Sequence, residues 1–214
     1  MKTIATEEFF NLIQQGADVL DTRSVEEFKK GFIPSSINIP AKGIKDWAAG
    51  LLKKEAPLLL VTEAGNEDET TAALQEAGYT NITGHLEGGF EAWQAAGKRI
   101  DMIIDVEPDE LMMDIPFDEN LIVVDVRKPI EYAEGHLKDA VNIPLHEISD
   151  PLKIAQFEES DNLYLHCGGG TRSVIAASVL KKHGVHNLRN ITGGWKKIKE
   201  EPKAEIVKQP DVLN

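Results

Sequence analysis

The sequence predicts an α/β protein made of two tandem domains, each with a mostly parallel central sheet and helices on both faces. The stretch "VLDTRSVEEFKKGFIPSSINIP" at 19–40 returns as "VVDVRKPIEYAEGHLKDAVNIP" at 123–144, with eight of 22 positions identical. A second pair, "GYTNITGHLEGGFEAW" at 78–93 and "GVHNLRNITGGWKKI" at 184–198, follows each stretch. Within each copy, short apolar runs alternate with helical segments, as in parallel sheets with crossover helices.

A repeat of this length is a whole domain rather than a solenoid unit. We therefore expect one domain over residues 1–104 and a second over residues 105–214, separated near "GKRIDMIIDVE". The net charge of −13 argues against nucleic acid or an anionic membrane as a partner, because both require an excess of basic side chains. The sequence shows neither a targeting segment nor an apolar run long enough to span a membrane, so we expect a cytoplasmic protein.

The elements of the second copy can be predicted in order. "LIVVDVR" is a buried strand because its apolar run is β-branched, and Pro129 opens the short helix "PIEYAEG". "AVNIP" and "NLYLHC" are further strands, and "TRSVIAASVLKKHG" is an amphipathic helix closed by Gly184. "NLRNI" is the next strand and "GGWKKIKEE" the terminal helix. The polar tail "EPKAEIVKQPDVLN" contains two prolines and is expected to be loosely attached.

The only cysteine, Cys167, lies where a predicted strand meets the following helix, which is where α/β sheets place their working sites. Glycines after it let backbone N–H groups turn inward as an anion-binding nest, and the helix start and Arg172 add positive charge. A thiol in this setting is predicted to ionise at neutral pH and to act as a nucleophile. The alternative, a buried structural cysteine, explains none of these neighbours. The candidate loop comprises Gly168, Gly169, Gly170, Thr171, Arg172 and Ser173.

The segment "CGGGTRS" resembles the active-site loop of the rhodaneses, which are single-cysteine sulfurtransferases. The segments "DVRKPIEYAEGHLKDAVNIP" and "ITGGW" resemble two further rhodanese motifs, and the resemblance covers both copies. It implies that Cys167 takes sulfane sulfur from thiosulfate or a persulfide, forms a persulfide, and passes the sulfur to a thiophilic acceptor. The loop would hold the persulfide and its donor, with Thr171 and Ser173 supplying hydroxyl groups. The expected partner is a small anionic sulfur donor or a protein persulfide, with no cofactor and no metal site.

The first copy departs from this pattern. The constant offset of the repeat places Glu63 at the position of Cys167 and "AGNEDE" (64–69) at the position of the loop. The acidic side chains would repel an anionic donor and no nucleophile is left, so the first copy is predicted to be catalytically silent. The pairing of a silent and an intact copy resembles the double-rhodanese tail of metallo-β-lactamase/rhodanese fusions. A persulfide dioxygenase of that class is therefore a predicted partner.

Four further residues of the rhodanese-like motif are predicted to be structural. Asp125, Arg127 and Glu131 recur at the matching positions of the first copy, so a folding role shared by both copies is expected. Asp125 and Arg127 are expected to pair with each other or with Glu131. His136 is expected to be structural as well, as it is in the family that the motif resembles. His166 precedes the cysteine, and strand alternation predicts that it points to the opposite face.

Two other functions use similar residues. Cysteine-dependent phosphatases also combine a cysteine, an N–H nest and an arginine, but they place five residues between cysteine and arginine. The four residues here make a smaller ring, which suits one sulfur atom and crowds a tetrahedral phosphoryl group. No aspartate near the loop can be assigned as a general acid. The other alternative is a non-catalytic sulfur carrier or protein-interaction module. Whether Cys167 carries sulfur separates the sulfurtransferase from a pure interaction module.

Overall fold

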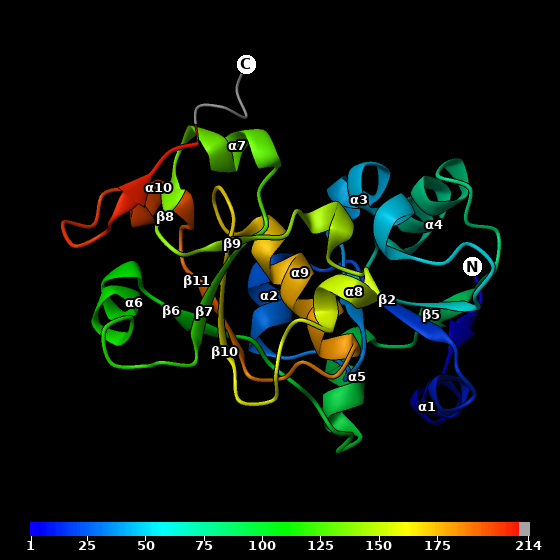
Figure 1. The fold of residues 1–214 in the computed structure, drawn as a ribbon. Helices are drawn as coiled ribbons and strands as arrows, with labels where there is room; N and C mark the ends of the chain where they lie inside the picture. Colours follow the sequence, from blue (N-terminus) through cyan, green and yellow to red (C-terminus); the bar gives the residue numbers. More distant parts are fainter. Residues whose placement is uncertain (210–214) are drawn as a thin grey trace. The chain divides into compact units, whose positions relative to one another are not determined.

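The computed structural model describes residues 1–209 and divides the chain into two compact units, Met1–Met102 and Ile103–Asn214. Each unit has a five-stranded sheet in which every pairing between strands is parallel (Figure 1). The predicted fold class, two tandem α/β units, is confirmed. The boundary expected after residue 104 falls within the strand Ile104–Val106. Among residues 1–209, no helix combines the length and the apolar character needed to cross a bilayer.

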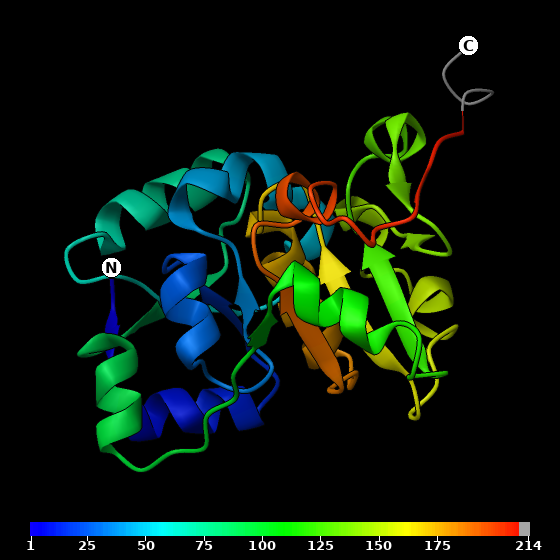
Figure 2. The same cartoon turned by 90° about the vertical axis from the view of Figure 1, so that its left-hand side faces the viewer.

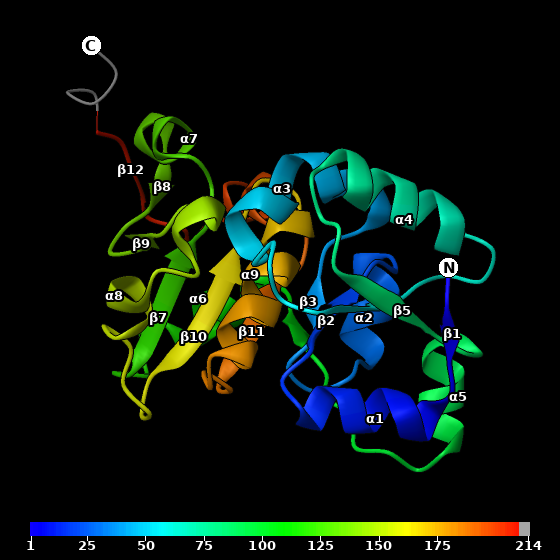
Figure 3. The same ribbon diagram turned by 90° about the vertical axis from the view of Figure 1, so that its right-hand side faces the viewer.

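The first unit has the strand order β1-β5-β4-β2-β3. Phe9 and Trp93 pack edge to face in its core with ring centroids 6.3 Å apart, which joins α1 and α5 on one side of the sheet. Helices α3 and α4 lie on the other side (Figure 3). The elements are β1 (Thr3–Ile4), α1 (Thr6–Gln14), β2 (Asp18–Asp21), α2 (Val25–Lys30), β3 (Ile37–Asn38), the 3-10 helix η1 (Ala41–Gly43), α3 (Ile44–Leu51), β4 (Leu58–Val61), α4 (Glu67–Glu76), β5 (Ile82–Leu86) and α5 (Gly89–Ala95).

The second unit repeats this architecture with the order β6-β11-β10-β7-β9. Leu111, Tyr164 and Ile198 belong to one buried cluster, so α6 and α10 cover the same face of the sheet. Helix α9 lies on the opposite face from α6 (Figures 2 and 3). The elements are β6 (Ile104–Val106), α6 (Pro108–Asp114), β7 (Leu121–Asp125), α7 (Pro129–Glu134), β8 (His136–Leu137), β9 (Val141–Asn142), η2 (Leu145–Glu147), α8 (Pro151–Ile154), β10 (Asn162–His166), α9 (Thr171–Lys182), β11 (Leu188–Ile191), α10 (Trp195–Ile198) and β12 (Ile206–Val207).

The strands predicted in the second copy are present as β7, β9, β10 and β11, and the helix opened by Pro129 is α7. One strand was not predicted, and one prediction about a less regular segment was wrong. The stretch read only as a boundary contributes β6, which pairs with β11 at the sheet edge. The tail is not loosely attached as far as residue 209, because β12 pairs with β8 and the Gln209 N–H donates to the Ala133 carbonyl. Residues 210–214 of the predicted tail lie outside the described residues.

Helix α9 was predicted to be amphipathic, and this was also wrong. Every residue from Ser173 to Lys181 is buried. Small side chains such as Ala176, Ala177 and Ser178 allow close packing on several sides, so no polar face is needed. The helix contacts β10 and β11, the two strands beside which it begins. The loop between β10 and α9 is therefore held at both ends by buried elements.

Candidate functional site

Cys167 follows β10, a strand hydrogen-bonded on both sides to β7 and β11. The residue is only 2% exposed. The Gly170 N–H donates to its Sγ at 3.1 Å, and the Ser173 hydroxyl lies 3.7 Å from the same atom. The Gly170 N–H is the closer donor to sulfur, because the single proton of the Ser173 hydroxyl has a nearer acceptor in Asn190 Oδ1 at 2.6 Å. The structure thus brings together three predicted site residues around one sulfur atom.

The loop requires glycine at its last position before α9. Gly170 has φ +113°, a conformation that residues with a side chain rarely adopt. Within the described part of the chain, no protein group accepts a hydrogen bond from the N–H of Gly168 or Gly169. These two N–H groups are therefore available to a bound anion, as the glycine nest predicted from sequence requires. Thr171 is exposed at the first residue of α9.

The segment that follows β11 supports the loop from its other side. The Trp195 N–H donates to the Cys167 carbonyl at 2.7 Å, and the Lys196 N–H donates to the Gly168 carbonyl at 3.3 Å. Gly194 makes this approach feasible, because a Cβ on it would lie 2.3 Å from the Cys167 carbonyl oxygen. The two glycines of "GGW" thus fix the backbone on which the cysteine is presented.

Arg172 forms a two-pronged ion pair with Glu131 at the start of α7. Its Nη1 and Nη2 atoms lie 2.7 Å and 2.8 Å from the two carboxylate oxygens. The bond from Arg172 lowers the pKa of Glu131 from 4.5 to about 2, and the same bond raises the pKa of Arg172. The sequence offered Glu131 only as an alternative partner of Asp125 and Arg127. Arg172 is therefore already neutralised by Glu131 where it borders the loop.

A buried ion pair lies beneath the loop. Arg127 Nη2 lies 2.6 Å from Asp125 Oδ2 and donates to the Gly135 carbonyl at 2.8 Å. The same guanidinium stacks over the Trp195 ring at 4.5 Å, which ties the ion pair to the segment that supports the loop. Asp125 and Arg127 therefore pair with each other, the first of the two expected arrangements. Among the described residues, neither side chain forms a hydrogen bond or ion pair with Cys167, and the pair supports the loop from below.

Two histidines lie near the site. His136 Nδ1 is 2.8 Å from the Tyr132 carbonyl, and the two rings stack 3.6 Å apart, as expected for a structural residue. His166 is fully buried, with Nε2 3.7 Å from Asp125 Oδ2. Burial lowers the pKa of His166, so its ring is neutral at neutral pH. Neither side chain is in hydrogen-bond contact with the thiol.

A polar chain that the sequence did not predict extends from the sulfur. The Ser173 hydroxyl lies 2.6 Å from Asn190 Oδ1, and Asn190 Nδ2 donates to Asp105 Oδ1 at 2.7 Å. Ser173 and Asn190 are both buried, so each needs such a partner. Asn190 comes from β11 and Asp105 from β6, far apart in sequence from the loop. Their position beside the loop follows from the order of the strands in the sheet, which the sequence alone does not reveal.

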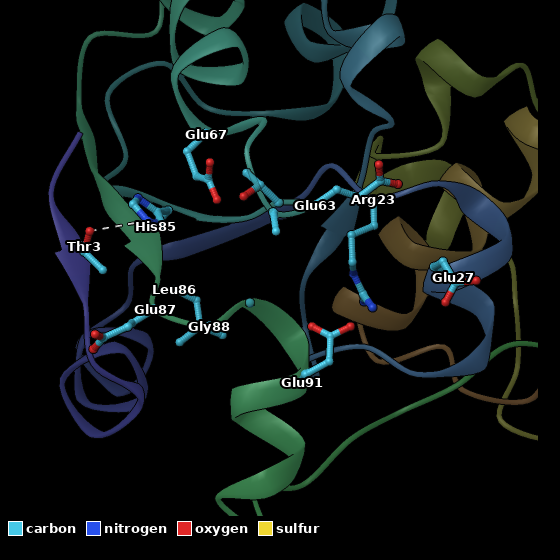
Figure 4. Close-up of a pocket in the computed structure, with 13 residues that line it drawn as sticks. Thr3, Arg23, Glu27, Glu63, Glu67, His85, Leu86, Glu87, Gly88 and Glu91 are labelled. Carbon is cyan, nitrogen blue, oxygen red and sulfur yellow. Dashed lines mark hydrogen bonds between the residues drawn. The ribbon is translucent and has the colours of Figure 1, made fainter.

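The matching position of the first unit is an acidic cavity of about 540 Å³. Glu63 from the loop after β4, Glu67 from α4 and Glu91 from α5 turn toward it (Figure 4). Arg23 also borders the cavity but is bound to Asp21 at 2.6 Å. The cavity wall carries no cysteine. Among residues 1–209, no group of three or more His, Cys, Asp or Glu side chains is arranged to hold a metal ion.

The profile of the Rhodanese-like domain family matches residues 5–96 and 103–201. The chain belongs to the rhodanese-like domain family. Its matched segments, one in each unit, make it a tandem member of that family, in agreement with the resemblance of the two sequence copies.

Three relatives illustrate the range of similarity. The chain is 32% identical over 89 residues to "Putative thiosulfate sulfurtransferase, mitochondrial" of Schizosaccharomyces pombe. This match covers 36% of this chain and 63% of that protein. It is 25% identical over 169 residues to "Putative sulfur carrier protein YrkF" of Bacillus subtilis, covering 76% of this chain and 88% of the relative. Identity to thiosulfate sulfurtransferase GlpE of Pseudomonas savastanoi is 33% over 95 residues, covering 44% of this chain and 88% of GlpE.

Proposed function

We propose that the second rhodanese-like unit is a sulfurtransferase that works through Cys167. The Cys167 thiolate attacks the outer, sulfane sulfur of thiosulfate or of a persulfide. The Sγ–S bond forms as the S–S bond of the donor breaks, and sulfite or a thiolate leaves with the bonding electron pair. A thiophilic acceptor then attacks the terminal sulfur of the Cys167 persulfide, and the thiolate returns. Neither step needs a cofactor, because sulfur transfer by thiolate attack is electronically complete.

The observation that carries this proposal is the setting of the sulfur atom. Sγ accepts the Gly170 N–H at 3.1 Å, while the N–H groups of Gly168 and Gly169 have no protein acceptor in the described residues. A persulfide adds one sulfur atom beyond Sγ, and backbone N–H groups without a protein acceptor suit the anion so formed. The relatives named as sulfurtransferases support the same chemistry, and thiosulfate is a donor named for two of them.

We propose that the first unit is catalytically silent. Glu63 stands where the second unit has its nucleophile, and the surrounding cavity gathers Glu67 and Glu91 as well (Figure 4). Carboxylates at this density oppose the approach of thiosulfate or of an anionic persulfide. The first unit then serves folding or the recognition of a partner. Cytoplasmic location and a persulfide dioxygenase partner both stay predictions of the sequence.

A sulfur-carrier role is the second candidate, because a relative that matches 76% of this chain is named as a sulfur carrier. A carrier and an enzyme share the Cys167 persulfide and differ in turnover. Intact-mass measurement after incubation with thiosulfate or glutathione persulfide tests the shared step, with Cys167→Ser as the control. The expected result is a gain of one sulfur atom on the wild type alone, released by cyanide as thiocyanate.

The same incubation with excess donor and cyanide separates the two candidates. Cyanide regenerates the Cys167 thiolate in both cases, so the two candidates differ in how fast the protein reloads. An enzyme produces many thiocyanate ions per chain in the time in which a slowly loading carrier produces one. Folded wild-type protein that has a titratable thiol but gains no sulfur from either donor would rule out both roles.

A further inference from the structure

The cations beside the Cys167 loop differ in their state of pairing. Arg172 is held by two bonds to Glu131. Lys197, which follows in α10, lies 3.2 Å from Glu107. Lys196 has no side-chain hydrogen bond or ion pair with any residue of the described chain. Its ammonium group is thus a cation near the loop whose charge no neighbouring carboxylate neutralises.

Lys196 also lies beside the exposed part of the loop. A Cβ built on Gly169 would lie 4.0 Å from its Nζ, and its own N–H donates to the Gly168 carbonyl. Gly169 is the exposed glycine of the loop, whereas Cys167 is buried. A donor that places its sulfane sulfur at Sγ therefore extends outward past Gly169. An anionic group on its outer part comes within reach of Nζ.

We propose that Lys196, and not Arg172, binds the anionic group of the sulfur donor. This inference rests on the proposed function and adds the residue that selects the donor class. The preferred donors are small persulfides that carry a carboxylate, or thiosulfate, whose sulfonate occupies the same position. Arg172 acts through Glu131 instead, by joining the start of α9 to α7. Because the donor charge lies outside the reacting S–S bond, Lys196 affects capture of the donor more than the chemical step.

The first test uses alkylation of Cys167, which requires no sulfur transfer. Iodoacetate and iodoacetamide deliver nearly the same group to the thiolate and differ in one negative charge, and Cys167 is the only cysteine that can react. Lys196→Gln is expected to slow the reaction with iodoacetate about two-fold to five-fold, the range of an exposed ion pair, and to leave the iodoacetamide rate unchanged. Lys199→Gln removes the same charge one turn later and is the matched control.

The second test uses sulfur transfer itself. The persulfides of mercaptopropionate and mercaptopropionamide are similar in shape and differ in charge. Lys196→Gln is expected to lower kcat/KM for the carboxylate donor by about two-fold to five-fold, mainly through KM, and to leave the amide donor unaffected. Added salt should reduce the preference of the wild type for the carboxylate donor, since exposed charges are screened.

The outcomes are separable. Equal rates of Lys196→Gln and wild type with iodoacetate would overturn the inference, as would equal losses with both alkylating agents, which would indicate a packing role. A charge-selective loss in alkylation together with no persulfide from any donor would keep Lys196 as an anion site and refute the proposed function. Glu131→Gln provides the remaining comparison: if it raises the iodoacetate rate while Lys196→Gln does not lower it, Arg172 is the anion site.

Discussion

Gly194→Ala is expected to disable the Cys167 loop although Gly194 touches no substrate. The new Cβ would lie 2.3 Å from the Cys167 carbonyl oxygen and 3.1 Å from its carbonyl carbon. Both are backbone atoms, so no side chain can rotate away. Gly194 also has φ +56°, which is strained for alanine.

The magnitude follows from these two costs. A non-glycine residue in such a backbone region costs about 1–3 kcal/mol, which a protein of ordinary stability survives. A Cβ atom essentially never comes within 3.0 Å of a non-bonded heavy atom. The Cys167 carbonyl oxygen, at 2.3 Å, must therefore move by about 0.7 Å. A misplacement near 1 Å costs about 100-fold in rate, so we expect a 10-fold to 100-fold loss of persulfide formation.

The assay is single-turnover persulfide formation followed by mass, with urea unfolding as a check of stability. Gly89→Ala is the matched control, because Gly89 has φ +63° at the corresponding position of the first unit, where the nearest atom is a flexible Glu91 oxygen at 3.2 Å. It should carry the backbone strain without the loss of rate. Wild-type rates in a folded Gly194→Ala protein would refute the view that the "GGW" segment positions the cysteine.

Three further predictions concern pH and the polar chain. Since Arg172 holds the pKa of Glu131 at about 2, their bond stabilises the fold fully above pH 4.5 and is lost as pH falls toward 2; urea unfolding of Glu131→Gln should lack this dependence. Burial lowers the pKa of His166, so the wild type should lose stability as pH falls below 6.5, and His166→Asn should lose less; equal slopes would contradict this. Ser173→Ala removes the hydroxyl that donates to the buried Asn190 Oδ1 and should lower the free energy of unfolding in urea by about 1–3 kcal/mol.

Much of the fold followed from the repeat, because two copies of one motif show which positions any domain of this kind needs. Strand-forming runs and the proline and glycine boundaries of helices are local signals, and they were read correctly around Cys167. The edge strand β6 and the paired tail strand β12 were missed because each has only two or three residues. Such short strands exist only through their partners β11 and β8, which a local pattern does not reveal.

The candidate site was only partly accessible from sequence. The loop residues after Cys167 are contiguous, so their proximity needed no fold. The bond between Arg172 and Glu131 joins residues 41 positions apart in sequence, and the bond from Lys196 to Gly168 joins residues 28 positions apart. Arg172 was not considered as a partner of Glu131, because the motif that contains Glu131 also contains Arg127, which lies nearer in sequence. A signal for Lys196 was present: it follows "GGW", the segment predicted to close the domain.

The two units together separate what the fold needs from what the chemistry needs. Asp21 at the end of β2 and Asp125 at the end of β7 each bind an arginine at 2.6 Å. That arginine donates to a glycine carbonyl at 2.9 Å in the first unit and 2.8 Å in the second. In both, it also stacks on an aromatic ring, Phe90 at 4.2 Å or Trp195 at 4.5 Å. This arrangement persists in a unit whose loop has lost its cysteine.

The two units differ in the residues that follow the central strand, which lie above the ion pair. Where the second unit has Cys167 and Arg172, the first has Glu63 and Asp68. The replacement reverses the charge at the carboxyl end of the central strand and leaves the ion pair beneath it intact. The charge of the loop residues and the ion pair beneath them therefore vary independently between the two units. Any activity of this chain with an anionic sulfur donor should depend on Cys167, and substitutions at Glu63 should leave it unchanged.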